Sequence, residues 1–186
     1  MVRIIAGTAR GRKLETLEGL ETRPTLDRVK EAVFGSMQFL IPGAEVLDLF
    51  SGSGNLGLEA ASRGAKSVVL NDRNPACIAI IRRNIDALGF AQTARTLNLD
   101  YAAAIDRLAA EGAAFDLAFL DPPYREGISG HAVRLLFEKR LIRTGGIVVL
   151  EHAAELPPLD APGVYRVAKT KRFGKCGYSL LEEDGQ

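Results

Sequence analysis

The chain has 186 residues, 47% hydrophobic and 25% charged, with a formal net charge of +1, which is ordinary for one globular domain with a full core. No apolar stretch reaches the roughly 18 residues of a membrane helix, the N-terminus lacks the apolar core of a secretory signal, and Cys77 and Cys176 are too few for a disulfide framework or a metal knuckle. We therefore expect a cytoplasmic protein without a metal site, whose two cysteines pack rather than react.

Basic residues gather at the two ends of the chain. Residues 1–13 and 163–177 contain no acid, and together they hold Arg3, Arg10, Arg12, Lys13, Arg166, Lys169, Lys171, Arg172 and Lys175. Without these nine residues, 15 Lys and Arg remain against all 23 Asp and Glu, so the rest of the chain carries −8. This distribution fits solvated tails and two ends that grip a polyanion equally well.

The first 42 residues are predicted to form an N-terminal extension. Residues 3–6 and 12–17 can pair as a small hairpin, with glycines in the turn between them. Thr25 is predicted to cap a helix from about residue 26 to 40, whose apolar residues share one face. The sequence Ile-Pro-Gly at 41–43 ends that helix and marks the boundary with a body at 43–186.

The body alternates between strands and helices. Strands are expected at 45–50, 67–72, 93–98, 114–120 and 145–151, and helices at 55–64, 75–89, 101–110 and 129–140. This alternation predicts an α/β fold with a parallel sheet covered on both faces. Residues 164–173 and 177–183 are predicted to add an antiparallel edge, whereas 152–162, with three prolines, is too short for a full helix.

A glycine-rich loop, DLFSGSGNLG at 48–57, follows the first strand of the body. Gly52 and Gly54 allow a sharp turn and a close approach to a ligand, which we expect beyond the carboxyl ends of the strands. The loop lacks the Gly-Lys-Ser/Thr of a P-loop, which disfavours nucleoside triphosphates. The spacing of glycines at 52, 54 and 57 fits a dinucleotide fingerprint, so NAD remains an alternative.

An acid stands at the end of each of the first three strands of the body. Asp48 could face the amino group of an amino-acid-like ligand, Asp72 could accept from both ribose hydroxyls, and Asp100 could accept from an adenine amine. Each acid alone could instead cap the next helix, but the three together favour S-adenosylmethionine. The candidate cofactor-binding residues are Asp48, Phe50, Ser51, Gly52, Gly54, Asn55, Leu56, Gly57, Asp72, Arg73, Asp100 and Tyr101.

The fourth strand ends in Asp121, Pro122, Pro123 and Tyr124, our candidate catalytic residues. An exocyclic amine on a base is a poor nucleophile, because its lone pair is delocalised into the ring. Asp121 and the carbonyl of Pro122 could accept its two hydrogens, the prolines fix the carbonyls beforehand, and Tyr124 could stack on the base. A simple Pro-Pro turn is the alternative, but the acid in front and the glycine-rich loop upstream favour amine methylation.

These motifs resemble those of class I S-adenosylmethionine-dependent methyltransferases with an amino-methylating D/N-P-P-Y/F/W motif. RIIAGTARGRKL, TRPTLDRVKEAVFGSM, VLDLFSGSGNLGLEAASRGA and LDPPY are similar to the RsmD family of bacterial enzymes, which methylate the 2-amino group of one guanine in 16S ribosomal RNA. The resemblance implies a Rossmann-like, mostly parallel seven-stranded sheet, S-adenosylmethionine as cofactor, and ribosomal RNA in a small subunit or assembly intermediate as partner. It also implies a monomer.

The resemblance further implies that the N-terminal arm and TRPT at 22–25 border the cofactor and contact RNA. With the basic ends, the candidate RNA-binding residues are Arg3, Arg10, Arg12, Lys13, Arg23, Thr25, Arg172 and Lys175. The second-strand acid of such enzymes is often Glu, so Asn71 remains an alternative to Asp72 at the ribose. The motif names the chemistry and not the base, so an adenine-N6 methyltransferase and a non-catalytic RNA-binding assembly factor stay open.

Overall fold

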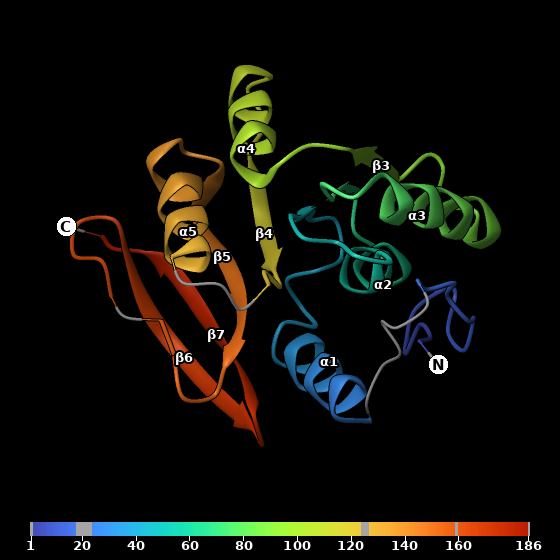
Figure 1. The fold of residues 1–186 in the computed structure, drawn as a ribbon, viewed down its shortest axis with the longest axis horizontal. Helices are drawn as coiled ribbons and strands as arrows, with labels where there is room; N and C mark the ends of the chain where they lie inside the picture. The colour runs from blue at the N-terminus through green and yellow to red at the C-terminus, as the bar shows by residue number, and fades with distance from the viewer. Residues whose placement is uncertain (1, 18–23, 124–126, 159, 186) are drawn as a thin grey trace.

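The computed structural model describes residues 2–17, 24–123, 127–158 and 160–185 (Figure 1), without the side chains of 24–27. The strands are β1 (Glu45–Asp48), β2 (Ser67–Asn71), β3 (Ala94–Leu97), β4 (Phe115–Leu120), β5 (Ile142–Ala153), β6 (Tyr165–Phe173) and β7 (Cys176–Glu183). The helices are α1 (Pro24–Ser36), α2 (Asn55–Ser62), α3 (Pro75–Leu88), α4 (Tyr101–Ala110) and α5 (Ile128–Glu138). None of the helices in these ranges has the length and apolar character needed to cross a membrane.

In the described part of the chain, the seven strands form one sheet in the order β3-β2-β1-β4-β5-β7-β6. Strands β1 to β5 pair in parallel, and β7 pairs antiparallel with both β5 and β6. The predicted Rossmann-like sheet with antiparallel C-terminal strands is confirmed. The last strand of the chain lies inside the sheet, between β5 and β6, so β6 forms the edge (Figure 1).

The sheet is covered on both faces, as predicted. One core cluster packs α1, α2, α3 and residues 2–14 against one face, and the other packs α4 and α5 against the opposite face. Neighbouring strand residues alternate between the clusters: Leu117 and Phe119 belong to the first, Ala118 and Leu120 to the second. Because side chains alternate between the two faces along a strand, the position of a residue just after a strand also determines toward which face of the sheet it points.

Local signals explain why α3 was predicted to within a residue. The side chain of Asn74 accepts a hydrogen bond from the N–H of Ala76 at 3.0 Å, Pro75 occupies the first helical position, and Gly89 ends the helix at a φ of 75°. A proline fits the first position because its missing N–H has no helical partner there. A glycine fits the end because it adopts a positive φ without steric cost.

Helix α1 differs from its prediction at both ends. It begins at Pro24, so Thr25 lies inside the helix instead of capping it, and it ends at Ser36 instead of residue 40. The turn at 37–40 leaves Phe39 and Leu40 exposed. A longer helix would bury neither of them, which removes the packing gain that usually extends a helix.

Two other segments are less regular than predicted. The N-terminal residues pair through a single antiparallel bridge between Arg3 and Lys13, flanked by backbone hydrogen bonds such as Ile4 N–H to Arg12 O at 2.9 Å. The pairing is confirmed, but neither side forms a strand. Within the described residues of 152–162 there is no helix, in line with the prolines there, and β5 is longer than predicted at both ends.

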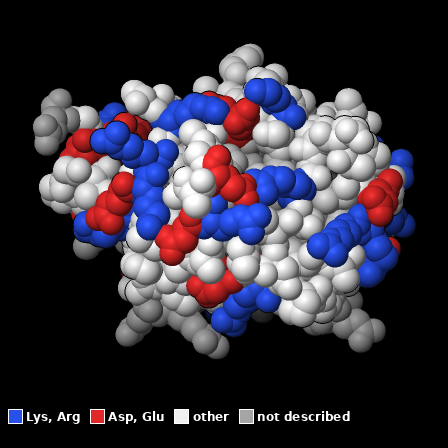
Figure 2. Space-filling view, turned by 90° about the horizontal axis from the view of Figure 1, so that it is seen from above, with Lys and Arg blue, Asp and Glu red and all other residues white. Residues whose placement is uncertain are grey.

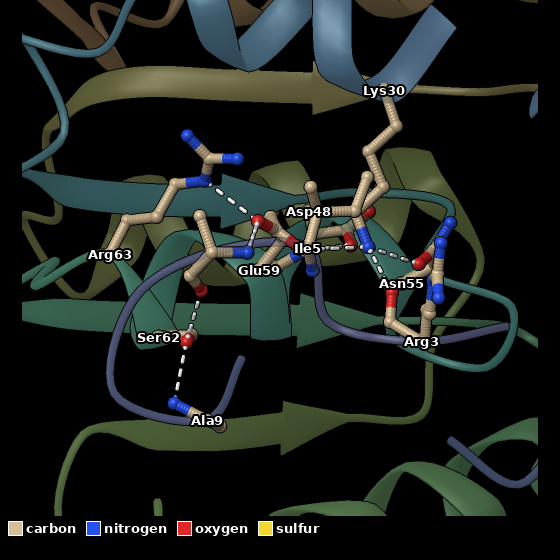
Figure 3. A network of polar contacts seen from close by, with 11 residues as sticks. Arg3, Ile5, Ala9, Lys30, Asp48, Asn55, Glu59, Ser62 and Arg63 are labelled. Atoms are coloured by element: carbon tan, nitrogen blue, oxygen red, sulfur yellow. Dashed lines mark hydrogen bonds and ion pairs between the residues drawn. The ribbon is translucent and has the colours of Figure 1, made fainter. Parts of the chain in front are cut away.

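A buried polar network fastens the N-terminal segment to the body (Figure 3). Glu59 of α2 is fully buried, and its Oε2 accepts from the N–H of Ile5 at 2.7 Å and lies 2.9 Å from Lys30 Nζ. Its Oε1 accepts from the N–H of Ala6 at 3.0 Å and from Arg63 Nε at 2.7 Å. One carboxylate thus satisfies two backbone donors and two cations, which a buried charge requires.

Lys30 extends the same network to the glycine-rich loop. Its Nζ donates to the backbone oxygen of Arg3 at 2.9 Å and to Oδ1 of Asn55, the first residue of α2, at 2.7 Å. Ser62 adds a further link, because its Oγ donates to Ala6 O at 2.6 Å and accepts from the N–H of Ala9 at 3.0 Å. The N-terminal segment, α1 and the loop are therefore held in one arrangement.

Candidate functional site

A cavity of about 420 Å³ opens at the carboxyl ends of the parallel strands. Its walls come from the glycine-rich loop, from the residues that follow β2, β3 and β4, from β5 itself and from α1. Gly52 of the first predicted loop and Asp121 of the second both line it. Strands β1 and β4 are direct neighbours, with Asp48 in register with Phe119, so the two loops face one space.

The glycine-rich loop needs its glycines for two different reasons. Gly52 and Gly54 have φ values of 56° and 85°, in the left-handed region that other residues rarely adopt. Gly57 has an ordinary φ, but a Cβ there would lie 2.8 Å from Leu70 Cδ2 and 3.1 Å from Asp48 Oδ2. Gly57 therefore lets α2 approach β2 and the carboxyl of Asp48.

Asp48 is buried at the end of β1, where it faces the cavity. Its Oδ2 accepts a hydrogen bond from the N–H of Gly57 at 2.8 Å. Burial raises the pKa of this carboxyl to about 7, against the opposing effect of the Gly57 N–H. A cationic group of a ligand would favour the ionised form, so the site suits an ammonium such as that of S-adenosylmethionine.

Asp72 anchors the loop and also lines the cavity. Its Oδ2 accepts from the N–H of Gly52 at 2.9 Å, and its Oδ1 accepts from the N–H of Asn74 at 2.8 Å. Because each carboxylate oxygen has a further lone pair, both oxygens can still accept from ribose hydroxyls. This geometry fits a nucleoside at the end of β2.

Asn71 is the weaker candidate for the ribose because its side chain is already engaged. Its Nδ2 donates to Leu49 O at 3.0 Å and to Leu99 O at 3.1 Å, and its Oδ1 accepts from the N–H of Leu99 at 3.3 Å. The residue is buried and ties the ends of three strands together. These contacts give Asn71 a structural role beside Asp72.

The third acid caps the next helix, which is the alternative role considered from the sequence, and it also lines the cavity. Asp100 caps α4, with its Oδ1 accepting from the N–H of Ala102 at 3.0 Å. Beside it, the rings of Phe50 and Tyr101 lie 5.6 Å apart. Two aromatic faces and an acceptor fit a purine at this end of the cavity.

The structure brings most of the predicted cofactor-binding residues together. Those lining the cavity are Asp48, Phe50, Ser51, Gly52, Asn55, Leu56, Asp72, Arg73, Asp100 and Tyr101. Gly54 and Gly57 shape the loop without lining the cavity. The predicted set therefore surrounds one elongated site.

Of the predicted catalytic residues, Asp121 and Pro123 line the cavity, while Pro122 is buried beside it. Tyr124 lies outside the described residues. The carboxyl of Asp121 is open to the cavity and makes no hydrogen bond or ion pair with any described residue. Protein atoms nevertheless surround the cavity on most sides, and this partial desolvation raises the pKa of Asp121 above its ordinary value.

Sequence reasoning missed several lining residues. Lys30 and Val33 of α1, Glu151 after the central part of β5, and Tyr178 of β7 all face the cavity. The signal for Glu151 was present, because it follows an apolar strand as Asp48 and Asp121 do. Nothing local marks Lys30, a lysine on the apolar face of an amphipathic helix, as a residue of the site.

The predicted RNA-binding residues lie at two places on the surface. Arg3, Arg10, Arg12 and Lys13 are exposed on the N-terminal segment, and Arg12 Nη2 also donates to Ala87 O at 2.7 Å. Arg172 and Lys175 are exposed at the turn between β6 and β7. Arg23 lies outside the described residues, and the side chain of Thr25 is not among those described.

The top of the molecule carries mixed charge. Figure 2 shows basic and acidic side chains next to one another there. Ion pairs on the surface of the described residues include Arg107 Nε with Glu111 Oε1 at 2.7 Å and Lys139 Nζ with Asp106 Oδ1 at 2.6 Å. This face should therefore attract a polyanion less strongly than the basic residues at the β6–β7 turn, which form no ion pair with any described residue.

The chain is similar to known proteins in both sequence and structure. A family model described as "Conserved hypothetical protein 95" matches residues 2–182. Ribosomal RNA small subunit methyltransferase D of Escherichia coli (strain K12) is 33% identical, with all of this chain and 91% of that protein covered. The solved structure of the putative methyltransferase yhhF of Escherichia coli is 35% identical, with a TM-score of 0.85 over 100% of this chain and 99% of that one.

A more distant likeness concerns the fold alone. The T. thermophilus 16S rRNA N2 methyltransferase RsmC, solved in complex with AdoMet and guanosine, is 23% identical with a TM-score of 0.68. The match covers 91% of this chain and 45% of that one. It shows that the sheet order and the flanking helices are those of a class I methyltransferase fold.

Proposed function

Because this chain belongs to the conserved hypothetical protein 95 family, and its relatives include ribosomal RNA small subunit methyltransferase D, we propose that it methylates the exocyclic N2 amine of a guanine in 16S ribosomal RNA, with S-adenosylmethionine as the methyl donor. The observation that carries this proposal is the shared cavity of Gly52 and Asp121. A methyl donor at the glycine-rich loop and an amine at Asp121 would lie next to each other there.

The residues around the loop fit the cofactor from end to end. Asp48 would hold its ammonium group, Asp72 its ribose hydroxyls, and Asp100 with the rings of Phe50 and Tyr101 its adenine. When bound, S-adenosylmethionine supplies a methyl group on a positively charged sulfur. The buried acid of Asp48 would favour a cation electrostatically, since charges interact more strongly away from bulk water.

Asp121 is the residue that would prepare the amine. Its carboxylate accepts one amine hydrogen, which orients the nitrogen lone pair toward the methyl carbon and prepays part of the ordering cost of the reaction. The amine becomes acidic once it carries the methyl group, so a carboxylate with a raised pKa suffices to take the released proton. Pro122 and Tyr124 keep the roles predicted from the sequence, at the second hydrogen and the face of the base.

The alternatives differ in what they predict for the cavity. An adenine-N6 enzyme would use the same carboxylate, an NAD enzyme would not need an acid beside the reacting end, and a non-catalytic assembly factor would need neither loop. The position of Asp121 favours a methyltransferase over the last two. The relatives named as ribosomal RNA methyltransferases favour ribosomal RNA as the substrate.

A methyl-transfer assay tests the proposal. We expect tritium from labelled S-adenosylmethionine to enter 16S RNA in unmethylated or partly assembled small subunits, and nucleoside analysis to show N2-methylguanosine. Calorimetry should show binding of S-adenosylmethionine and none of NAD. Methylated adenine would replace the proposed base, and binding of NAD without S-adenosylmethionine would contradict the proposed activity itself.

The basic residues at the β6–β7 turn are expected to contact phosphates. Replacing Arg172 and Lys175 by alanine should weaken RNA binding and lower the slope of log affinity against log salt by roughly 1–2, because each phosphate contact contributes about 0.7–0.9. Affinity for S-adenosylmethionine should not change. The control is Arg107→Ala, which removes an exposed basic residue that is paired with an acid; an equal slope in both variants would contradict the assignment.

The remaining parts of the proposal concern context. We place the protein in the bacterial cytoplasm, where small subunits are assembled, and we propose that it acts as a monomer. The chain spans almost the whole length of its relatives. Recognition would depend on RNA shape and on the basic ends, with the target base leaving its stack to enter the cavity.

A further inference from the structure

Glu151 lies directly beside Asp121 at the mouth of the sheet. Strands β4 and β5 are parallel neighbours, and Leu120 is in register with Leu150. Asp121, the residue that follows β4, and Glu151 of β5 therefore emerge on the same side, about 4.8 Å apart along the sheet. Both carboxyl groups line the cavity.

The Glu151 carboxyl is not engaged by the described part of the protein. It makes no hydrogen bond or ion pair with any described residue, and it is half-buried near Val33, Val149 and Tyr178, which line the same cavity. The hydroxyl of Tyr178 is used, because it donates to Ala32 O at 3.2 Å. Burial and the negative charge of Asp121 raise the pKa of Glu151 to about 8, so the group is largely uncharged at neutral pH.

The order of the strands decides which part of the substrate faces Glu151. The cofactor loop belongs to β1 and β2, on one side of β4, whereas β5 lies on the other side. With the cofactor over β1 and the amine at Asp121, the ring of the base extends away from the cofactor, toward β5. Glu151 therefore faces ring atoms next to the amine and not the methyl donor.

We propose that Glu151 selects guanine by pairing with its N1–H and O6, next to the N2 amine held by Asp121. The inference rests on the proposed function. An uncharged carboxyl accepts from N1–H through its carbonyl oxygen and donates its hydroxyl hydrogen to O6, which makes two hydrogen bonds. Adenine held by its amine presents a bare N1 and a C2–H at the same place, so it makes at most one.

Three variants test the role of the side chain. With unmethylated small subunits as substrate, Glu151→Ala should lower kcat/KM by roughly 10–100-fold, because a buried base edge loses its partner. Glu151→Gln should stay within about threefold of the wild type, since the amide offers the same acceptor and donor. The matched control Glu155→Ala removes an exposed acid four residues away and should have no effect, and affinity for S-adenosylmethionine should be equal in all four proteins.

A change in the base tests the contact itself. Small subunits can be reconstituted with 2-aminopurine in place of the guanine that the enzyme methylates. This base keeps the 2-amino group but lacks both N1–H and O6. The wild type should lose roughly 10–100-fold in kcat/KM on this substrate, whereas Glu151→Ala should lose little more, because the two changes remove one interaction. If Glu151 contacts this edge of the base, the losses from the two changes do not add. A general structural effect of the substitution would instead add to the loss caused by the altered base.

The outcomes separate this inference from the proposed function. Full activity of Glu151→Ala, an inactive Glu151→Gln, or equal discrimination against 2-aminopurine by wild type and Glu151→Ala would each overturn the role of Glu151. Failure of the wild type to label guanine at all would instead overturn the proposed function. Thermal unfolding of each variant shows whether a loss of activity reflects a loss of fold, and the glutamine variant keeps the test decisive if the alanine variant is unstable.

Discussion

Asp121→Ala is expected to lower the single-turnover rate of methyl transfer by about 10²–10³-fold, while affinity for S-adenosylmethionine stays unchanged. The size follows from the loss of one preorganised hydrogen-bond partner of the reacting group. The cofactor loop should be unaffected, because Asp121 makes no hydrogen bond or ion pair with any described residue. Asp121→Asn should retain part of the activity, since its carbonyl oxygen can still accept an amine hydrogen.

The measurement is tritium transfer with enzyme in excess over small subunits, alongside calorimetry with the cofactor. The control Asp86→Ala removes an exposed acid on α3 and should behave like the wild type. Transfer to guanine at the wild-type rate by Asp121→Ala would contradict the mechanism. If Asp121→Ala instead methylated adenine at a normal rate, a group other than Asp121 would position the base.

The same carboxyl gives the reaction a pH dependence. Partial desolvation raises the pKa of Asp121, so the protonated form, which accepts poorly from an amine, appears at a higher pH than for an ordinary aspartate. The rate should therefore fall on the acid side earlier than an unperturbed carboxyl would allow. The Asp121→Asn variant should lack this fall, because its amide does not titrate.

Replacement of Glu59 by leucine is expected to lower the free energy of unfolding by roughly 3–5 kcal/mol, which is the usual cost of breaking a buried ion pair from one side. The change removes the buried carboxylate that lies 2.9 Å from Lys30 Nζ and leaves the backbone N–H groups of Ile5 and Ala6 without the acceptors they use. Urea unfolding gives the free energy directly. Glu59→Gln should cost less, since its carbonyl oxygen still accepts.

Two comparisons make this prediction specific. Lys30→Met combined with Glu59→Leu should cost less than the sum of the two single changes, because no uncompensated charge then remains buried. Glu111→Ala, which removes an acid from partly exposed ion pairs with Arg95 and Arg107, should change the free energy of unfolding far less, because solvent screens such pairs. A change for Glu59→Leu as small as that for Glu111→Ala would show that the network adds little to stability.

The parts of the fold that were predictable have local causes. Helix α3 carries Asn74, Pro75 and Gly89 at its ends, and the parallel strands are apolar runs that stop at an acid or a glycine. The rule that ligands bind beyond such strand ends predicts that Asp48 and Asp121 lie at one edge of the sheet, and both line the cavity. The same rule would have found Glu151, had the end of the fifth strand been treated like the others.

The parts that were missed depend on contacts between distant residues. The Lys30–Glu59 pair joins residues 29 positions apart on two helices, and no periodicity in either helix marks it. Helix α1 starts at Pro24, one residue before the Thr25 that local capping preference selects. The place of β7 inside the sheet is a matter of topology, which a list of strands does not determine.

The hydrogen bonds that Glu59 accepts from the backbone of Ile5 and Ala6 affect how the protein folds during translation. Residues 5 and 6 are translated before their hydrogen-bond acceptor, Glu59, which lies 54 and 53 residues later in the chain, respectively. The beginning of the nascent polypeptide must therefore wait until α2 has left the ribosome before it can settle. Strand β7 emerges after β5 and β6 and has to enter between them, so the cavity wall that holds Tyr178 is completed only after the other strands of the sheet have been made.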